Sequence, residues 1–274
     1  MDLLFEAFLD DNLYTDNIGA IWLDTINNKI VVELFDPSEQ NISNFEENIL
    51  EHSSLYFTIS EGIIEIQESQ NHHVIDDTDT RSTTVHPGAA LFSASCYRSI
   101  GYRARNRNNQ WGFVTASHRE QPNVTWAALP YRTRLYTSTR FVGQVTETQL
   151  SGIDAAFITL ASGLTMSSVT VAGQNSGLNS TNAVVGGSAL RVSNGGNSPL
   201  TASGRVVSLR EIWIGAGPAV NTIRTDNMTV VSGDSGGIVL HGSSGNFSVG
   251  GIVVADTLYV AAPTINSFFA LSTN

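Results

Sequence analysis

The chain has 274 residues, 41% hydrophobic and 14% charged, a length that can enclose a sizeable core in one large or two modest domains. No apolar run approaches the roughly 18 residues of a membrane-spanning helix, and the single cysteine, Cys96, excludes an intramolecular disulfide and a cysteine-based metal site. The net charge of −11 is uneven, because residues 1–85 carry 18 acidic and 2 basic side chains, whereas residues 86–274 carry 7 acidic and 12 basic ones. The positive part is only weakly basic and its arginines are scattered, so we expect no nucleic-acid partner.

The first elements in chain order predict a compact α+β unit over residues 1–68. Residues 18–36, IGAIWLDTINNKIVVELFD, place a turn-rich stretch between two apolar segments, which predicts a β-hairpin. Residues 37–52 have apolar side chains at helical spacing, and residues 55–67 return to strand character. Residues 69–87 are polar, lack periodicity and end in proline, so we expect an exposed linker there.

Residues 88–274 are a series of short apolar segments separated by turns rich in Gly, Asn and Ser. This spacing predicts a mainly β domain, either an antiparallel barrel or a sandwich. The expected strands include QWGFVTAS, DAAFITL, SVTVAG, ALRVS, GRVVSLREIWIG and VGGIVVA.

The stretch VSGDSGGIV places Ser235 in a glycine-rich turn that runs into an apolar strand. A serine hydroxyl is a weak nucleophile unless a base removes its proton, and that base works best when a carboxylate orients it. Of the histidines in this part of the chain, His118 ends the apolar run WGFVTASH, whereas His86 lies in the linker and His241 in a polar turn. Asp154 lies in an otherwise apolar segment, where an unpaired carboxylate is costly. We therefore take His118 as the candidate base and Asp154 as its partner.

These motifs carry a resemblance to a known family. TASH, DAAFITL and SGDSGG occur in the order His, Asp, Ser, and together with SIGYRAR, ALRVSNGGNSPLTASGRVVSL and NTIRTDN they resemble the trypsin/chymotrypsin-like serine proteases. The similarity is closest to the bacterial streptogrisin and α-lytic protease group and spans most of residues 88–270. It implies a mainly β fold, a chymotrypsin-like double antiparallel β-barrel over residues 88–274 preceded by a small α+β pro-domain.

The resemblance also implies an activity, that of a serine endopeptidase made as a zymogen with an inhibitory and folding pro-region. Ser235 would be the nucleophile that forms the acyl-enzyme, His118 the general base and then acid, and Asp154 the orienting carboxylate. The backbone N–H groups of Gly233 and Ser235 would form the oxyanion hole. Asp234 would be a buried structural acid that pairs either with a new N-terminal amine or with other polar groups. No metal and no cofactor are implied.

The resemblance places the substrate pocket between residues 228–232 and 254–259. We take its lining residues to be Thr229, Val230, Val254, Ala255 and Asp256. Most of these side chains are neutral, which favours an uncharged P1 residue. Asp256 would select Arg or Lys if it lay inside the pocket, and we expect it at the rim instead.

Three departures from the family leave a second class of function open. The family normally has a cysteine after the histidine that bridges back to a preceding strand, but here Arg119 follows His118, and Cys96 lies slightly off the expected position. The cysteine that usually precedes the serine is also missing. Val254 stands where relatives place a serine that contacts the triad aspartate. The alternative is thus a weak or inactive protease fold that serves as a binding protein, although the complete triad favours the enzyme.

The expected partners follow from this interpretation. We expect a protein or peptide substrate, and residues 1–85 bound in cis as the pro-region until the linker is cut. The opposite charges of the two parts would strengthen that docking. We expect a monomer with no membrane partner. The family implies secretion, although the acidic start MDLLFEAFLDDN lacks the features of a signal peptide.

Overall fold

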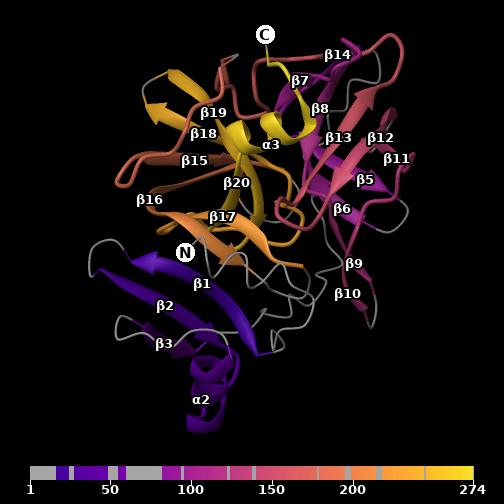
Figure 1. Cartoon of the computed structure of the whole chain (residues 1–274). Helices are drawn as coiled ribbons and strands as arrows, with labels where there is room; N and C mark the ends of the chain where they lie inside the picture. The colour runs from indigo at the N-terminus through magenta and orange to yellow at the C-terminus, as the bar shows by residue number, and fades with distance from the viewer. Residues whose placement is uncertain are drawn as a thin grey trace.

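The computed structural model describes residues 17–24, 28–48, 55–59, 82–93, 96–121, 124–137, 140–177, 179–194, 199–213, 218–243 and 245–273. Most of these residues form β-strands (Figure 1). Among them, no helix has both the length and the apolar character to cross a membrane.

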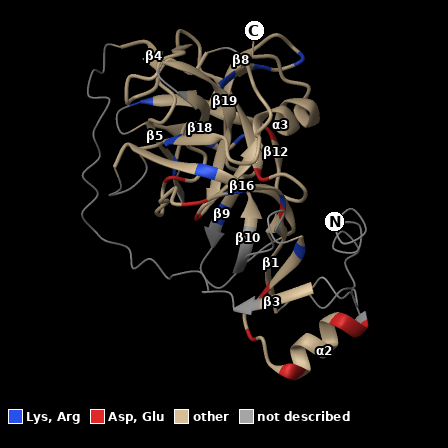
Figure 2. Cartoon of the chain, turned by 90° about the vertical axis from the view of Figure 1, so that its left-hand side faces the viewer, with Lys and Arg blue, Asp and Glu red and all other residues tan. Residues whose placement is uncertain are grey.

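The N-terminal unit, residues 17–59, consists of β1 (Ile18–Asp24), β2 (Lys29–Leu34), α2 (Glu39–Asn48) and β3 (Leu55–Ile59). As predicted, β1 and β2 pair antiparallel, and β3 then runs parallel to β2 after the α2 crossover. Phe45 of α2 is buried against apolar side chains of the strands. Acidic residues mark both ends of α2 (Figure 2). The second half of the predicted strand 55–67 and residues 69–81 of the predicted linker lie outside the described residues.

The first barrel is a seven-stranded antiparallel sheet in the order β6-β5-β11-β12-β13-β8-β7. Its interior is a buried apolar cluster that includes Leu91, Phe113, Leu135 and Ile158. A separate hairpin, β9 with β10, leaves this barrel after β8. The bounds of these strands are β5 (Ala90–Ser93), β6 (Cys96–Ser99), β7 (Arg103–Arg105), β8 (Trp111–Thr115), β9 (His118–Gln121), β10 (Val124–Ala128), β11 (Arg134–Tyr136), β12 (Phe141–Gln149) and β13 (Ala155–Leu160).

The second barrel uses six strands in the order β15-β18-β19-β20-β17-β16, with β15 also paired to β16. All of these pairings are antiparallel. The predicted mainly β architecture with two antiparallel barrels is therefore confirmed. The bounds are β15 (Ser188–Val192), β16 (Thr201–Trp213), β17 (Val220–Thr225), β18 (Ile238–Ser243), β19 (Asn246–Ala255) and β20 (Leu258–Ala261).

The N-terminal unit continues the sheet of the second barrel. β1 pairs antiparallel with the end of β16, with Ile21 opposite Ile212 and Trp22 opposite Glu211, so that nine strands form one sheet. Ile212 belongs to the same buried apolar cluster as Ile21 and Val32. Figure 1 shows the indigo unit beside β16 and β17. Backbone hydrogen bonds and a shared core thus join the acidic part of the chain to the second barrel.

Some elements differ from the expectations; the end of the expected exposed linker, for example, forms the short strand β4 (Thr84–Val85), in which Val85 is fully buried. The stretch SVTVAG forms no strand but a tight turn closed by the Thr170–Gln174 backbone hydrogen bond, with Gly173 at φ +84°. Conversely, the last strand, β20, is followed by an unexpected helix, α3 (Ala262–Phe269), which begins with a proline in its first turn and buries Ile265 and Phe269. A proline costs nothing at a helix start, where its missing N–H has no partner in any case.

Candidate active site

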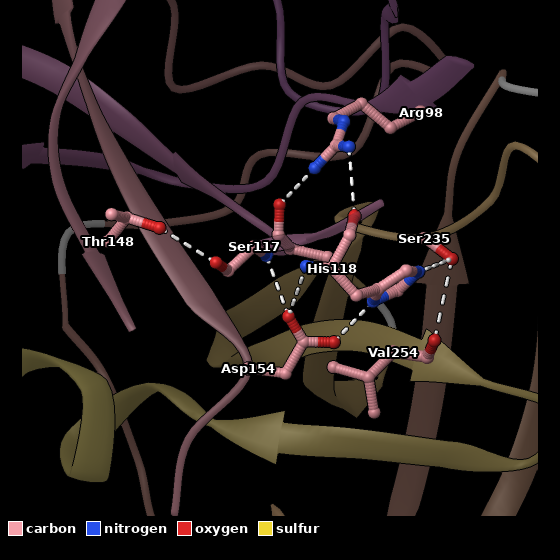
Figure 3. Close-up of polar contacts among 8 residues, drawn as sticks. Arg98, Ser117, His118, Thr148, Asp154, Ser235 and Val254 are labelled. Carbon is pink, nitrogen blue, oxygen red and sulfur yellow. Dashed lines mark hydrogen bonds and ion pairs between the residues drawn. The ribbon is translucent and has the colours of Figure 1, made fainter. Parts of the chain in front are cut away.

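His118 is the first residue of β9 and lies three residues beyond the end of β8, where the chain turns into the β9–β10 hairpin. The residue is buried, with 7% of its surface exposed. Its Nδ1 atom contacts Oδ2 of Asp154, and its Nε2 atom lies 3.0 Å from Oγ of Ser235 (Figure 3). The structure thus brings together all three residues that the motifs singled out, although they are separated by up to 117 positions in the sequence.

Asp154 precedes β13 and is fully buried. Its Oδ1 atom accepts hydrogen bonds from the backbone N–H groups of Ser117, at 2.7 Å, and of His118, at 2.8 Å. Its Oδ2 atom faces the imidazole. A buried carboxylate is tolerated when hydrogen bonds satisfy it, and these contacts do so while they fix the orientation of the histidine ring.

The contacts of His118 determine where its proton belongs. A carboxylate can only accept, so Nδ1 must carry the proton that faces Asp154. In the neutral imidazole, Nε2 then has the free lone pair and can accept the hydroxyl proton of Ser235. Oγ of Ser235 also lies 3.4 Å from the carbonyl oxygen of Val254. This arrangement can activate the serine as a nucleophile.

Glycines shape the turn that presents Ser235. Gly233 and Gly236 have φ of +91° and +85°, a region that other residues rarely adopt. A Cβ atom on Gly236 would also lie 2.6 Å from the carbonyl oxygen of Ser99. Ser99 of β6 holds the turn, because its Oγ donates to the Gly233 carbonyl at 3.0 Å and its N–H donates to the Ser235 carbonyl at 2.9 Å. The motif therefore needs its glycines for backbone geometry.

The carbonyl oxygens of Gly233 and Ser235 are bound by Ser99, whereas the backbone N–H groups of the same two residues remain available. Among the described residues, neither Gly233 nor Ser235 donates a backbone hydrogen bond. Free N–H groups next to a nucleophile are what an oxyanion hole requires. No described group of three or more His, Cys, Asp or Glu side chains could hold a metal ion beside them.

Asp234 belongs to a buried ion pair. Its Oδ2 atom lies 2.5 Å from Nη1 of Arg191, and both side chains are fully buried. Ser193 donates to Oδ1 at 2.7 Å, and the N–H of Val231 donates to Oδ2 at 2.9 Å. Burial lowers the pKa of Arg191, and the charge of Asp234 opposes that shift. Of the two alternatives left open by the sequence, Asp234 thus pairs with internal polar groups.

The five expected pocket residues differ in exposure. Val254 is buried, Val230 and Ala255 are half-buried, and Thr229 and Asp256 are exposed. The negative charge of Asp256 raises the pKa values of Glu211 and Arg224, so its carboxylate lies near these two residues of β16 and β17. Of these five described residues, only Val254 hydrogen-bonds to Ser235, through its carbonyl oxygen.

Three further residues support the site, namely Arg98, Ser99 and Arg191, and none of them was among the predicted site residues. Arg98 and Arg191 are buried arginines in strands, at 2% and 0% exposure. Each stands in a segment otherwise made of apolar and small residues, which is the signal that singled out Asp154. Applied to cations, the same argument would have indicated buried partners for both.

By sequence, a family model described as Pro-like C-terminal domain matches residues 1–60, which include the N-terminal unit. No curated protein matches the chain.

By structure, several bacterial proteases are similar. Protease A of Thermobifida fusca has a TM-score of 0.54 at 22% identity, covering 69% of this chain and 97% of its own. A Nocardiopsis protease has a TM-score of 0.56 at 21% identity, covering 69% and 98%. A homologue of α-lytic protease has a TM-score of 0.53 at 20% identity, covering 70% and 100%.

The chain therefore has the fold of the chymotrypsin-like serine proteases. The resemblance to the α-lytic and streptogrisin group, inferred from the motifs, is confirmed at the level of the fold. Each of these neighbours is matched almost in full, and just under a third of this chain has no counterpart in them.

Proposed function

We propose that this protein is a serine endopeptidase with His118, Asp154 and Ser235 as its catalytic residues. One observation carries the proposal: a continuous hydrogen-bonded chain runs from the buried Asp154 through both ring nitrogens of His118 to Oγ of Ser235. A histidine buried only for packing needs neither partner, whereas a nucleophile and its oriented base need both.

In the proposed mechanism, Oγ of Ser235 attacks the peptide carbonyl carbon while His118 Nε2 takes its proton. The oxyanion receives hydrogen bonds from the N–H groups of Gly233 and Ser235. The imidazolium, stabilised by Asp154, then gives the proton to the leaving amine, and the acyl-enzyme remains. Water, activated by the same histidine, hydrolyses the ester and restores Ser235.

The N-terminal unit is proposed to be a pro-region that docks in cis. Its strand β1 extends the sheet of the second barrel, and the match to a Pro-like domain falls on the same part of the chain. Side chains also bridge the two parts, because Arg224 of β17 lies 3.8 Å from Glu33 and stacks on the ring of Trp22. We propose that this unit inhibits the enzyme until the linker is cut, and that the processed enzyme is a monomer.

The preferred substrate is a polypeptide with an uncharged P1 residue. Thr229, Val230, Val254 and Ala255 contribute no charge to the proposed pocket. The fifth residue, Asp256, is exposed and lies near Arg224. That position favours the rim over the base of the pocket for its carboxylate.

The test is covalent labelling of Ser235. The purified chain is incubated with a fluorophosphonate, before and after limited proteolysis of the linker, and its intact mass is measured beside Ser235→Ala. We expect one adduct on the wild type, none on the variant, and faster labelling after the linker is cut. A chain that stays unlabelled in both forms would exclude the enzyme and leave the binding protein as the remaining interpretation.

A further inference from the structure

Arg98 is a buried cation at the back of the candidate active site. It lies on β6, opposite Leu91 of β5, with 2% of its surface exposed. Its guanidinium donates to the carbonyl oxygen of Ala116 through Nη1 and to that of His118 through Nη2, the latter at 2.9 Å (Figure 3). One side chain therefore binds both carbonyls that flank Ser117, in the segment that carries the histidine.

Asp154 binds the same segment, residues 116–118, through its N–H groups. The N–H groups of Ser117 and His118 both donate to its Oδ1 atom. The backbone of residues 116–118 is thus clamped between a cation on its carbonyls and an anion on its N–H groups. Hydrogen bonds to charged groups are the stronger ones, and the planar fork of arginine suits two acceptors at once.

We infer that Arg98 is a positioning residue for His118, and that its two hydrogen bonds fix the backbone that carries the imidazole. With a single cysteine, this chain has no intramolecular disulfide to fix that segment. Arg98 reaches from the preceding strand β6 to the same stretch of backbone. The inference rests on the proposed function, since the clamp matters for catalysis only if His118 is the base.

The clamp has a specific consequence for the reaction. Its loss leaves the substrate pocket intact but lets the imidazole move relative to Ser235, and a misplacement of about 1 Å can cost about a hundredfold in rate. The rate of the chemical step should fall while binding of the reagent stays unchanged. A residue that only stabilised the barrel would alter the two together, or neither.

The experiment compares Arg98→Met and Arg98→Lys with the wild type, in whichever form of the chain reacts with the fluorophosphonate. The labelling rate at saturation, kinact, reports the activation of Ser235, and KI reports binding of the reagent. We expect Arg98→Met to lower kinact by about a hundredfold with KI within about twofold of the wild type. Arg98→Lys, which keeps the charge but loses the fork, should lie in between.

Arg140→Met is the matched control, because Arg140 also donates to a backbone carbonyl, that of Thr84 at 2.8 Å, but at a distance from the site. It should leave kinact unchanged. If Arg98→Met does not fold, Arg98→Lys decides the question alone. A folded Arg98 variant with wild-type kinact, or one whose loss equals that of Arg140→Met, would overturn the inference.

A second measurement separates this inference from the proposed function. Amide hydrogen exchange of residues 116–119 should quicken in Arg98→Met and stay unchanged in Arg140→Met, whether or not the protein reacts with the reagent. If the wild type never labels but exchange quickens in Arg98→Met, the role of Arg98 is supported and the proposed enzyme activity is excluded. If the wild type labels and exchange in Arg98→Met is unchanged, the role of Arg98 is excluded and the proposed enzyme activity is supported.

Discussion

Arg224 donates two parallel hydrogen bonds to the fully buried carboxylate of Glu211, each 2.6 Å long. The pair lies where the N-terminal unit joins the second barrel, since Glu211 is opposite Trp22 in the sheet and Arg224 also faces Glu33. Burial raises the pKa of Glu211 to about 7, assisted by the charges of Glu33 and Asp256 and opposed by Arg224. An ordinary glutamate in the unfolded chain ionises near pH 4.3.

This difference predicts a stability that depends on pH. Because the folded chain holds the Glu211 proton more tightly than the unfolded chain does, the contribution of this group is complete below about pH 4 and is lost as pH rises through about 7. From the size of the shift, the free energy of unfolding should fall by at most about 4 kcal/mol over this window. Denaturant unfolding of the whole chain between pH 5 and pH 8 measures it.

Two substitutions check the assignment of that pH dependence. Glu211→Gln cannot ionise, so the wild-type slope between pH 5 and pH 8 should flatten. Glu39→Gln, at an exposed position on α2, should keep the slope of the wild type. Equal slopes in wild type and Glu211→Gln would show that another group titrates.

The Arg191–Asp234 pair should be strongly coupled. Both side chains are fully buried, so removal of one partner leaves an unpaired charge in the core, which costs about 3–5 kcal/mol. We expect Arg191→Met and Asp234→Asn each to destabilise the protein and to slow labelling of Ser235, because the turn that presents it contains Asp234. The double variant should lose far less than the sum of the two, as measured by denaturant unfolding. Additive losses would contradict a direct pair.

Val254→Ser introduces the serine that the resemblance in the sequence implies beside Asp154. Val254 is buried in the core of the second barrel, so the loss of its methyl groups should lower the free energy of unfolding by about 1–2 kcal/mol. If the new hydroxyl donates to Asp154, the rate of labelling should rise severalfold. Val254→Ala, which has the smaller side chain without the hydroxyl, is the control. If both variants label at the same rate, Asp154 needs no further donor.

The processing site should lie before residue 82. Residues 84–85 form β4, which pairs in parallel with β14 (Thr165–Met166), and Val85 is fully buried in the core of the first barrel. A cut after Val85 would remove these contacts. N-terminal sequencing of the processed protein should therefore start at or before Ser82, and a stable product that starts at Gly88 would contradict this.

Much of the architecture was predictable from local pattern. Alternation around a turn indicated the hairpin of β1 and β2, and the order of three short motifs indicated which histidine, aspartate and serine meet. The prediction that they meet did not require knowledge of the strand pairing, because an aspartate in an apolar segment requires a partner wherever it lies.

The supporting residues were not predictable in the same way. Arg98 acts across 18 to 20 positions, and Arg191 across 43, and nothing near either residue in the sequence shows which carbonyl or carboxylate the fold will bring to it. Helix α3 was missed for another reason: it begins at Ala262, directly after the last residue of β20, so no loop marks the change of period.

If the proposed processing removes the N-terminal unit, the nine-stranded sheet loses three strands. While β1 is in place, the end of β16 is an interior strand with neighbours on both sides, β17 and β1. Departure of the N-terminal unit would turn that end of β16 into a bare edge, and the apolar Ile212 would lose its cover from Ile21. An unpaired strand edge beside an apolar side chain is a template for pairing with another chain. Removal of the N-terminal unit would thus expose an edge strand on the second barrel that can pair with another copy of the chain. A monomeric processed protein must prevent that pairing.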